Sequence, residues 1–524
     1  MWLKIFGLVT CVKLLLINAY KSTDFEVHRN WLAITHSLPL NQWYVSNASI
    51  WTLDYPPFFA WFEYLWSQLA QFVDPEMLKV SNLEYDSEAT IIFQRLTVIF
   101  SDFIFALGAR KLSNYISSHP LRKCSYQNHK WFSPSTVFLC LSIGNAGLLM
   151  IDHIHFQYNG ILMGLFFLSV GEILDGNHLL GAFYFSVLLN MKHIYLYVAP
   201  AYIVYLLRNY CLVEDKNGAI DTKKSFAKLS RLGTIVLLTT CAAFGPFILN
   251  GQLLVVLKRL FPFKRGLCHS YWAPNFWVMY NIADKLLIFL GRKLGWPIKE
   301  VRGSMTAGLV QEYPHSVLPS ITPPVTMLLT VVSIMPCMWK LWTHPGNPLH
   351  FLRSIIICAS CSFLFGWHVH EKAILIAILP LCFMAVLWRA EAETFLIISL
   401  SGLYSLFPLL FPKDMLLIKA LLYLSFSFYS FKSLENLFQS RDPKSSLAFP
   451  LLTPLETVYA LGFSFVFIYE IMQVYNLSTW TTTYPFLHLM LTSFYCSSGI
   501  IYSVVKYYLN FMKTEPSNRK QRIF

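Results

Sequence analysis

The residues most able to do chemistry in this sequence occur in short clusters of acids and bases. The stretch at 21–31, which reads KSTDFEVHRNW, brings Asp24, Glu26, His28 and Arg29 together directly after an apolar segment. A carboxylate can act as a general base toward a hydroxyl group. A neighbouring cation can hold a phosphate and stabilise the charge that develops as the phosphate leaves. These groups suit transfer from a phosphate ester to a hydroxyl.

Three further clusters of this kind follow along the chain. They contain Asp54 and Tyr55 in LDYPPFFAW; Asp152, His153, His155 and Gln157 in DHIHFQYNG; and His368, His370 and Lys372 in HVHEK, to which Arg265 in RLFPFKRG is added. Ionisable groups at a membrane surface are costly to desolvate and tend to mark function. One such cluster could equally be an ordinary polar loop or a cap over helix ends. Four clusters that mix acids with cations favour a shared site.

Long apolar runs identify the elements that must position these clusters. The chain has 524 residues, is 55% hydrophobic and 13% charged, and contains runs such as AILIAILPLCFMAVLW and VYALGFSFVFIYEIM. A run of about 20 apolar residues crosses a bilayer as a helix, which satisfies its own backbone hydrogen bonds. The sequence predicts an all-α, polytopic transmembrane helical bundle of roughly 11–14 spans, whose lumenal loops form the active site. The run lengths and the low charge argue against a soluble protein.

Charge in the loops predicts the orientation of the bundle. The basic loops HPLRKCSYQNHK and KNGAIDTKKSFAKLSR and the basic tail indicate the cytosolic side. The expected organisation is a first transmembrane helix at 1–20, a lumenal loop with the catalytic acid at 21–92, a transmembrane module with lumenal motifs at 93–372, and C-terminal transmembrane helices with a cytosolic basic tail at 373–524. The stretch 278–320 stays open between ordinary spans and a re-entrant or broken helix.

The motifs also limit the chemistry. The G-x-x-x-x-G-K-[ST] motif and the dinucleotide-binding fingerprint do not occur in the sequence. The D-H-x-H spacing at 152–155 is short, and no typical three-ligand set accompanies it. We therefore expect no cofactor, no bound metal and no nucleic-acid partner, although the net charge is +13. Aromatic residues beside the acids can stack on sugar rings, so a sugar carried on a lipid phosphate fits the pattern best.

Five ordered motifs carry a family resemblance. They read TDFEVHRNW, LDYPPFFAW, DHIHFQYNG, RLFPFKRG and HVHEKAIL, and they resemble the endoplasmic-reticulum glucosyltransferases of the GT-C superfamily that use dolichyl-phosphate glucose. The resemblance extends over about 22–372. At the first motif, Val27, His28 and Asn30 differ from members that add the first glucose to the dolichol-linked N-glycan precursor. The stretch is more similar to members that add the second glucose.

The resemblance implies substrates and residue roles. The donor would be dolichyl-phosphate glucose and the acceptor a monoglucosylated dolichol-pyrophosphate oligosaccharide, with membrane lipids as further partners. Transfer would form an alpha-1,3 bond with inversion, at the lumenal face of the endoplasmic-reticulum membrane, with Asp24 as the catalytic base. The expected substrate-binding residues are Glu26, Arg29, Asp54, Tyr55, Asp152, His153, His155 and Gln157. The residues expected at the donor phosphate are Arg265, His368, His370 and Lys372.

Other functions remain open at this point. The chain could add the first glucose of the same pathway. Many spans with polar groups also fit a transporter or lipid scramblase, although transporters usually place charges near the midplane and show repeated halves. A non-catalytic scaffold of the glycosylation machinery is the third alternative.

Overall fold

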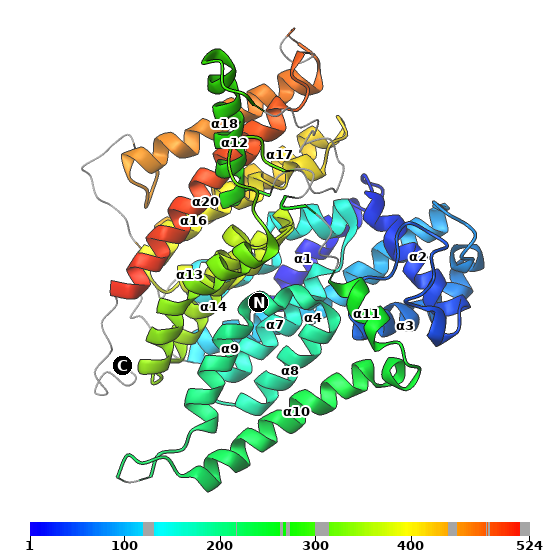
Figure 1. Cartoon of the computed structure of the whole chain (residues 1–524), viewed down its shortest axis with the longest axis vertical. Coiled ribbons are helices and arrows are strands. Elements are labelled where there is room, and N and C mark those ends of the chain that lie inside the picture. Colours follow the sequence, from blue (N-terminus) through cyan, green and yellow to red (C-terminus); the bar gives the residue numbers. More distant parts are fainter. Residues whose placement is uncertain are drawn as a thin grey trace.

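The computed structural model of the chain describes residues 1–118, 130–215, 217–261, 266–268, 273–298, 314–438, 448–477, 479 and 483–513. Within these ranges the backbone is helical, and its β structure is limited to two isolated bridges. The predicted all-α class is therefore confirmed. Figure 1 shows the helices gathered into a bundle, with α2 and α3 at one flank, α12 and α18 at one end and α10 at the other.

The N-terminal part of the bundle extends to α11; the symbol η denotes 3₁₀ and π helices. Its elements are α1 (Trp2–Leu15), α2 (Thr23–Ser37), η1 (Leu40–Gln42), α3 (Pro57–Val73), η2 (Pro75–Leu78), α4 (Glu88–Ser118), η3 (Lys130–Phe132), α5 (Pro134–Ile143), α6 (Ala146–Leu148), η4 (Leu149–Phe156), α7 (Asn159–Leu174), α8 (His178–Met191), η5 (His193–Val198), α9 (Ala199–Leu206), η6 (Leu207–Cys211), α10 (Thr222–Leu249) and α11 (Leu253–Leu260).

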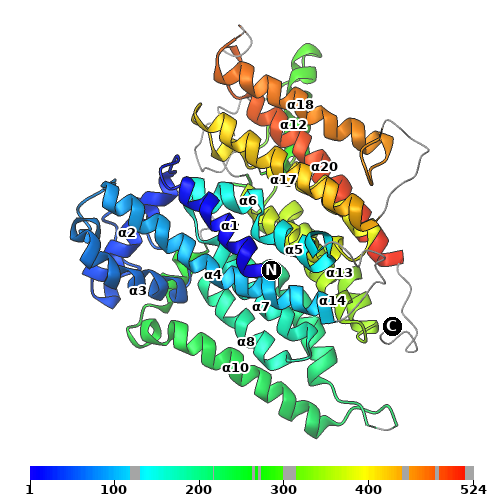
Figure 2. The ribbon, with the colours of Figure 1, turned by 180° about the vertical axis from the view of Figure 1, so that it is seen from behind.

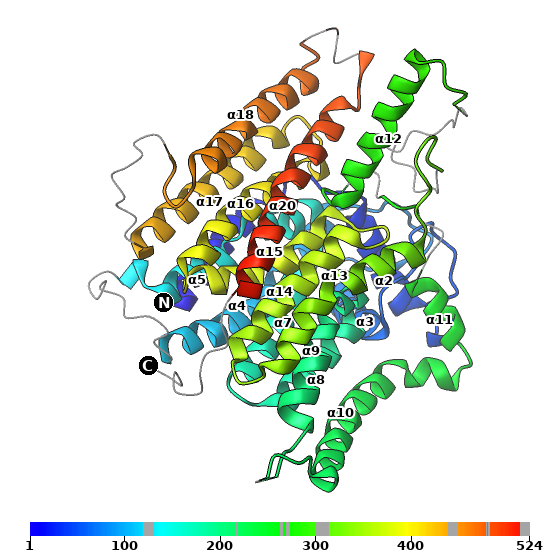
Figure 3. The same cartoon turned by 60° about the vertical axis from the view of Figure 1, so that its left-hand side comes forward.

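The C-terminal part contains several long helices that lie side by side (Figure 3). Its elements are α12 (Phe276–Lys293), α13 (Pro323–Thr343), α14 (Pro348–Phe365), η7 (Glu371–Ile374), α15 (Leu375–Ala385), α16 (Arg389–Tyr404), η8 (Phe407–Leu409), α17 (Met415–Phe438), α18 (Pro454–Val474) and α20 (Leu487–Lys513). The ambiguous stretch 278–320 begins within α12, and its part at 299–313 lies outside the described residues.

Nine helical segments in the described ranges are long and apolar enough to cross a membrane. They are Glu88–Ser118, Pro134–Phe156, Thr222–Leu249, Pro323–Thr343, Pro348–Phe365, Arg389–Leu409, Met415–Phe438, Pro454–Val474 and Leu487–Lys513. The helices α7 and α8 are also apolar but shorter. Large apolar side chains such as Leu237 on α10 and Phe465 on α18 are exposed. Lipid accommodates such faces, so the chain is a polytopic membrane protein as predicted.

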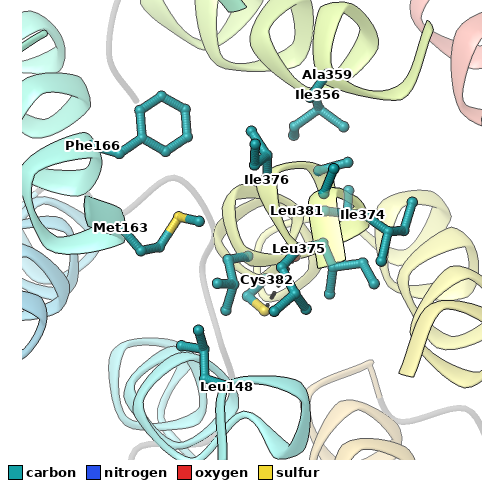
Figure 4. Packing of buried hydrophobic residues seen from close by; sticks show 14 of the residues in the cluster. Leu148, Met163, Phe166, Ile356, Ala359, Ile374, Leu375, Ile376, Leu381 and Cys382 are labelled. Carbon is teal, nitrogen blue, oxygen red and sulfur yellow. Dashed lines mark hydrogen bonds between the residues drawn. The ribbon is translucent and has the colours of Figure 1, made fainter. Parts of the chain in front are cut away.

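The centre of the bundle is α15, which is buried along its whole length. Figure 4 shows Ile376 and Leu381 of this helix surrounded by apolar side chains of other helices, among them Leu148, Phe166 and Ile356. Because η7 leads directly into α15, the side chains just before α15 are attached to a fully buried helix.

The helices α2 and α3 form one flank of the bundle (Figures 1 and 2). Aromatic rings pack this flank together. Trp31 of α2 lies edge-on to Tyr55 and Phe59, with ring centroids 5.0 and 5.9 Å away. Edge-to-face pairs of this kind add to the stabilisation from burial alone. They hold the loop that precedes α3 against α2, so the first two polar motifs of the sequence are brought together.

The helices α4 and α7 approach each other closely at two glycines. A Cβ added at Gly164 would lie 2.5 Å from the backbone of Ile104 and Phe105. A Cβ added at Gly108 would lie 2.6 Å from the carbonyl oxygen of Gly164. Small residues at such positions allow membrane helices to pack backbone to backbone. This contact fixes α7, whose first residues belong to the polar cluster described below.

The substitution Gly164→Ala should destabilise the protein, because backbone atoms on α4 cannot move aside as a flexible side chain could. Overpacking of this kind costs about 1–3 kcal/mol. We expect a lower apparent melting temperature in detergent. The matched control is Gly233→Ala on α10, where nothing lies within 4 Å of the added Cβ. There alanine should leave the stability unchanged or raise it slightly, and equal melting curves for both variants would contradict the close contact.

Candidate active site

Two helix ends meet at the start of α2. The Ser22 side chain caps this helix by accepting a hydrogen bond from the backbone nitrogen of Asp24 at 3.1 Å. The Ser22 hydroxyl and backbone nitrogen donate to the carbonyl oxygen of His155, at 2.6 and 3.1 Å. The first turn of α2 is thereby tied to the last turn of η4, although the sequence separates them by more than a hundred residues.

The end of η4 has an unusual backbone. Residues 149–156 form a π-helix, a form found frequently at functional sites. It ends at Phe156, whose φ of +86° lies in the left-handed region that a bulky residue rarely adopts. This conformation breaks the helix and directs the next residue, Gln157, toward α2.

Asp24 is the centre of the cluster. Its Oδ2 atom accepts hydrogen bonds from Lys372 Nζ at 2.8 Å and Gln157 Nε2 at 2.6 Å, and lies 3.2 Å from His155 Nε2. The side chain of Asp24 keeps 25% of its surface exposed. A substrate hydroxyl can therefore reach this carboxylate, as a general base requires.

The charge of Asp24 is secured by its partners. Burial by itself would raise the pKa of the Asp24 carboxyl group, and the charge of the Lys372 ammonium is the largest influence that lowers it. The pKa of Asp24 is therefore held well below its usual value. The position of Asp24 in the first turn of α2 acts in the same direction, because a helix N-terminus favours negative charge.

His155 takes part as a neutral imidazole. Its Nδ1 atom lies 3.3 Å from the carbonyl oxygen of Leu409, which can only accept, so Nδ1 carries the hydrogen. Its Nε2 atom lies 2.9 Å from the Lys372 ammonium, which can only donate, so Nε2 provides a lone pair. His155 thus steers Lys372 toward Asp24 and adds no second positive charge.

A chain of hydrogen bonds leads from Asp24 to a second lysine. Gln157 Oε1 accepts from Asn159 Nδ2 at 2.9 Å, and Asn159 Oδ1 accepts from Lys192 Nζ at 3.1 Å. Asn159 Nδ2 also donates to Asp152 Oδ1 at 2.8 Å. Asp152 Oδ2 accepts from the backbone nitrogen of Gly160 at 2.7 Å, so Asp152 caps the start of α7. Asp152 therefore belongs to the same network as Asp24.

Asp54 and Tyr55 lie beside this network. The pKa of the Tyr55 phenol is raised by burial and then by the charges of Asp54, Asp24 and Asp152. The structure thus brings the second motif close to the first and third. The ring of Tyr55 faces Lys192, whose ammonium lies 4.9 Å from the ring centroid.

Glu26 and Arg29 bind each other instead of facing Asp24. Arg29 has no exposed surface and forms two hydrogen bonds of 2.7 Å to the Glu26 carboxylate. It also donates to the carbonyl oxygen of Met77 at 2.9 Å. The pair therefore joins α2 to η2, and we expect it to position the flank rather than to contact a substrate.

His153 also points away from Asp24. Its Nε2 atom lies 2.8 Å from Asp102 Oδ2, which also accepts from Lys13 Nζ at 2.6 Å. All three side chains are buried. This group ties α1, α4 and η4 together, so its role in the described structure is to hold η4 in place.

The residues of the fourth motif contact two different parts of the structure. Lys372 reaches Asp24, whereas His368 Nδ1 bonds to the carbonyl oxygen of Gly266 at 2.8 Å. His368 has a left-handed φ of 50°, and its ring centroid lies 5.6 Å from that of His370. The backbone before η7 is thus docked on residues 266–268. Arg265 lies outside the described residues.

Sequence reasoning did not identify Ser22 or Lys192 as parts of the site. It noted Asn159 within the third motif but assigned no role to it. Lys192 lies in LLNMKHIYLY at the end of an apolar run. A lysine in such a position is costly to bury, and this could have marked it as a functional residue.

Among the described residues, no group of three or more His, Cys, Asp or Glu side chains is arranged to hold a metal ion.

An all-α membrane bundle whose partly exposed Asp24 carboxylate is paired with Lys372 has the groups that a membrane-embedded transferase needs. Comparison with known proteins makes this class specific. The model of the ALG6, ALG8 glycosyltransferase family matches residues 9–507, and the chain belongs to this family.

Similar curated proteins occur in animals and plants. A Bos taurus protein named dolichyl pyrophosphate Glc1Man9GlcNAc2 alpha-1,3-glucosyltransferase is 48% identical over 518 residues, which cover 98% of this chain and 96% of that protein. A Drosophila melanogaster protein with the same name, marked probable, is 47% identical over 96% of this chain and 93% of its own. An Arabidopsis thaliana protein of that name is 42% identical over 95% of each chain.

The pH dependence of activity should reveal the contact between Lys372 and Asp24. In Lys372→Met the largest influence that lowers the pKa of Asp24 is lost, while burial, which raises it, stays. The carboxylate will then be protonated at a higher pH than in the wild type. We expect the acid limb of the rate profile, normalised to each protein's own maximum, to move to higher pH.

The control for this measurement is Lys79→Met, which removes an exposed lysine paired with Glu76 on the same flank. Its acid limb should coincide with that of the wild type. An unchanged acid limb in Lys372→Met would show that Lys372 does not set the protonation of Asp24.

Proposed function

We propose that this protein transfers glucose from dolichyl-phosphate glucose to Glc1Man9GlcNAc2 carried on dolichyl pyrophosphate, forming an alpha-1,3 bond. The names of the similar proteins in Bos taurus, Drosophila melanogaster and Arabidopsis thaliana support the acceptor and the linkage. Family membership favours this activity over a transporter or a scaffold. The observation that carries the chemistry is the partly exposed Asp24 carboxylate, which is held ionised by Lys372.

The reaction is a single displacement. The acceptor 3-hydroxyl oxygen attacks the anomeric carbon of glucose, and its proton passes to a carboxylate oxygen of Asp24. The bond between the anomeric carbon and the phosphate oxygen breaks, and dolichyl phosphate leaves with the bonding electrons. A beta-linked donor thereby becomes an alpha-linked product.

Lys372 would contact first the Asp24 carboxylate and then the donor phosphate. Before the donor binds, its ammonium is shared between Asp24 and His155. The donor phosphate competes for the same ammonium, and any weakening of the ion pair makes Asp24 a stronger base. Donor binding would thus activate the base, and Lys372 would then stabilise the negative charge of the leaving phosphate.

The site is proposed to open to the lumen of the endoplasmic reticulum. The basic loops and tail of the sequence support a cytosolic position for the opposite ends of the helices. Both substrates carry lipid tails, so donor and acceptor would reach Asp24 from the bilayer.

The decisive experiment is transfer of labelled glucose by the purified protein with lipid-linked acceptors that carry no glucose or one glucose. We expect transfer to the monoglucosylated acceptor. Asp24→Asn should keep the fold but reduce kcat by about 10²- to 10⁴-fold, the usual contribution of a general base.

Asp86→Asn is the matched control, because Asp86 is exposed and its partner is Lys21. It should retain wild-type turnover. Full activity of Asp24→Asn would remove the proposed base. Transfer only to the acceptor without glucose would assign the protein to the first step instead.

A further inference from the structure

We propose that Lys192 is a second cation of the site and binds the phosphate of the lipid-linked sugar donor opposite Lys372. This inference rests on the proposed function, because it assigns a new residue to the leaving group of that reaction. The class of ligand is a lipid phosphate ester. The assignment follows from the position, the partners and the charge surroundings of Lys192.

The position of Lys192 is set by a break between two helices. Helix α8 ends at Met191, and Lys192 adopts an extended backbone before η5 begins at His193. Its backbone nitrogen still donates to the carbonyl oxygen of Leu188 at 2.9 Å, so the residue is firmly attached to α8. The extended conformation turns the side chain out of the helical path and toward the start of α7.

The partners of Lys192 leave its charge uncompensated at short range. Its ammonium donates to the neutral Oδ1 atom of Asn159 at 3.1 Å and faces the ring of Tyr55 at 4.9 Å. Among the residues that the structure describes, no carboxylate forms an ion pair with it. Lys372, Lys111 and Lys13 all have such a partner. An ammonium group has several N–H donors, so Lys192 can bind an anion without breaking an existing ion pair.

The two lysines of the site act on each other. Burial, and then the charge of Lys372, lower the pKa of Lys192 to about 8, while Asp152, Asp24 and Asp54 oppose this shift. The lysines lie at opposite ends of the hydrogen-bond chain that passes through Asp24, Gln157 and Asn159. An anion placed near both would relieve their repulsion, and it would lie beside the carboxylate that takes the acceptor proton.

The reaction itself favours two cations. A sugar phosphodiester carries one negative charge, and the phosphate monoester that leaves gains a second charge as the sugar–oxygen bond breaks. A cation at this position therefore binds the leaving group more strongly than the intact donor. Interactions that strengthen in the transition state raise kcat, whereas uniform binding only lowers KM.

The test compares Lys192→Met, Lys192→Arg and wild type in direct binding of dolichyl phosphate and of dolichol, which lacks the phosphate. Methionine has a similar length but no charge. We expect Lys192→Met to weaken binding of dolichyl phosphate about 10- to 100-fold, the usual effect of losing a charge-assisted hydrogen bond. Binding of dolichol should not change, and Lys192→Arg should restore much of the affinity.

Turnover provides a second readout. Lys192→Met should raise the KM for dolichyl-phosphate glucose and lower kcat, while the KM for the oligosaccharide acceptor stays within about twofold of wild type. The exposed Lys79→Met serves as the control and should match wild type in both assays. Melting curves in detergent show whether each variant is folded.

The outcomes separate the two proposals. Unchanged affinity for dolichyl phosphate in a folded Lys192→Met protein would overturn the role of Lys192, even if the wild type transfers glucose. Equal loss of affinity for dolichol and dolichyl phosphate would also overturn it, because a general packing defect would then explain the effect. Phosphate-dependent binding without any glucose transfer would support the lysine site and contradict the proposed function.

Discussion

The ion pair between Asp24 and Lys372 is the contact on which the site depends. It joins residues 348 positions apart in the chain, one in the first turn of α2 and the other directly before the central helix α15. Burial disfavours the charged form of a carboxylate, and a cation close by favours it. The contact with Lys372 provides that cation, and it also places a phosphate-binding group beside a potential base. One interaction therefore positions both the base that a displacement reaction needs and the cation that can bind the leaving phosphate.

Two residues with a left-handed backbone conformation lie close in the sequence to side chains that contact Asp24. The left-handed conformation of Phe156 ends the π-helix and turns Gln157 toward Asp24. The left-handed conformation of His368 shapes the turn before η7, the short helix that contains Lys372. Each such residue costs about 1–3 kcal/mol and persists only where the surrounding packing outweighs the strain. Here the buried α15 and the cap by Ser22 supply that packing.

The bundle contains two kinds of ionic contact. Groups such as Lys13 with Asp102, and Arg29 with Glu26, are buried and closed, and they join helices or loops. The Asp24 cluster is partly exposed, and its lysine is shared between two partners. A closed pair is costly to break because it leaves an uncompensated buried charge. A shared and accessible one can exchange a partner for a substrate, which is the property that an enzyme needs.

The sequence by itself determined the helical class, the membrane location and the four polar motifs, because apolar run length and local charge are properties of neighbouring residues. It also indicated Asp24 as the central acid and the family to which the chain belongs. It could not tell that His155 and Lys372 would share Asp24 while His153 turned toward Asp102 and Arg29 toward Glu26. Side chains that are neighbours in one motif point in different directions, because the π-helix and the left-handed residues Phe156 and His368 change the path of the backbone. The tertiary structure decided these contacts, as well as the hydrogen bond that brings Lys192 into the network, since such contacts form only when distant helices pack.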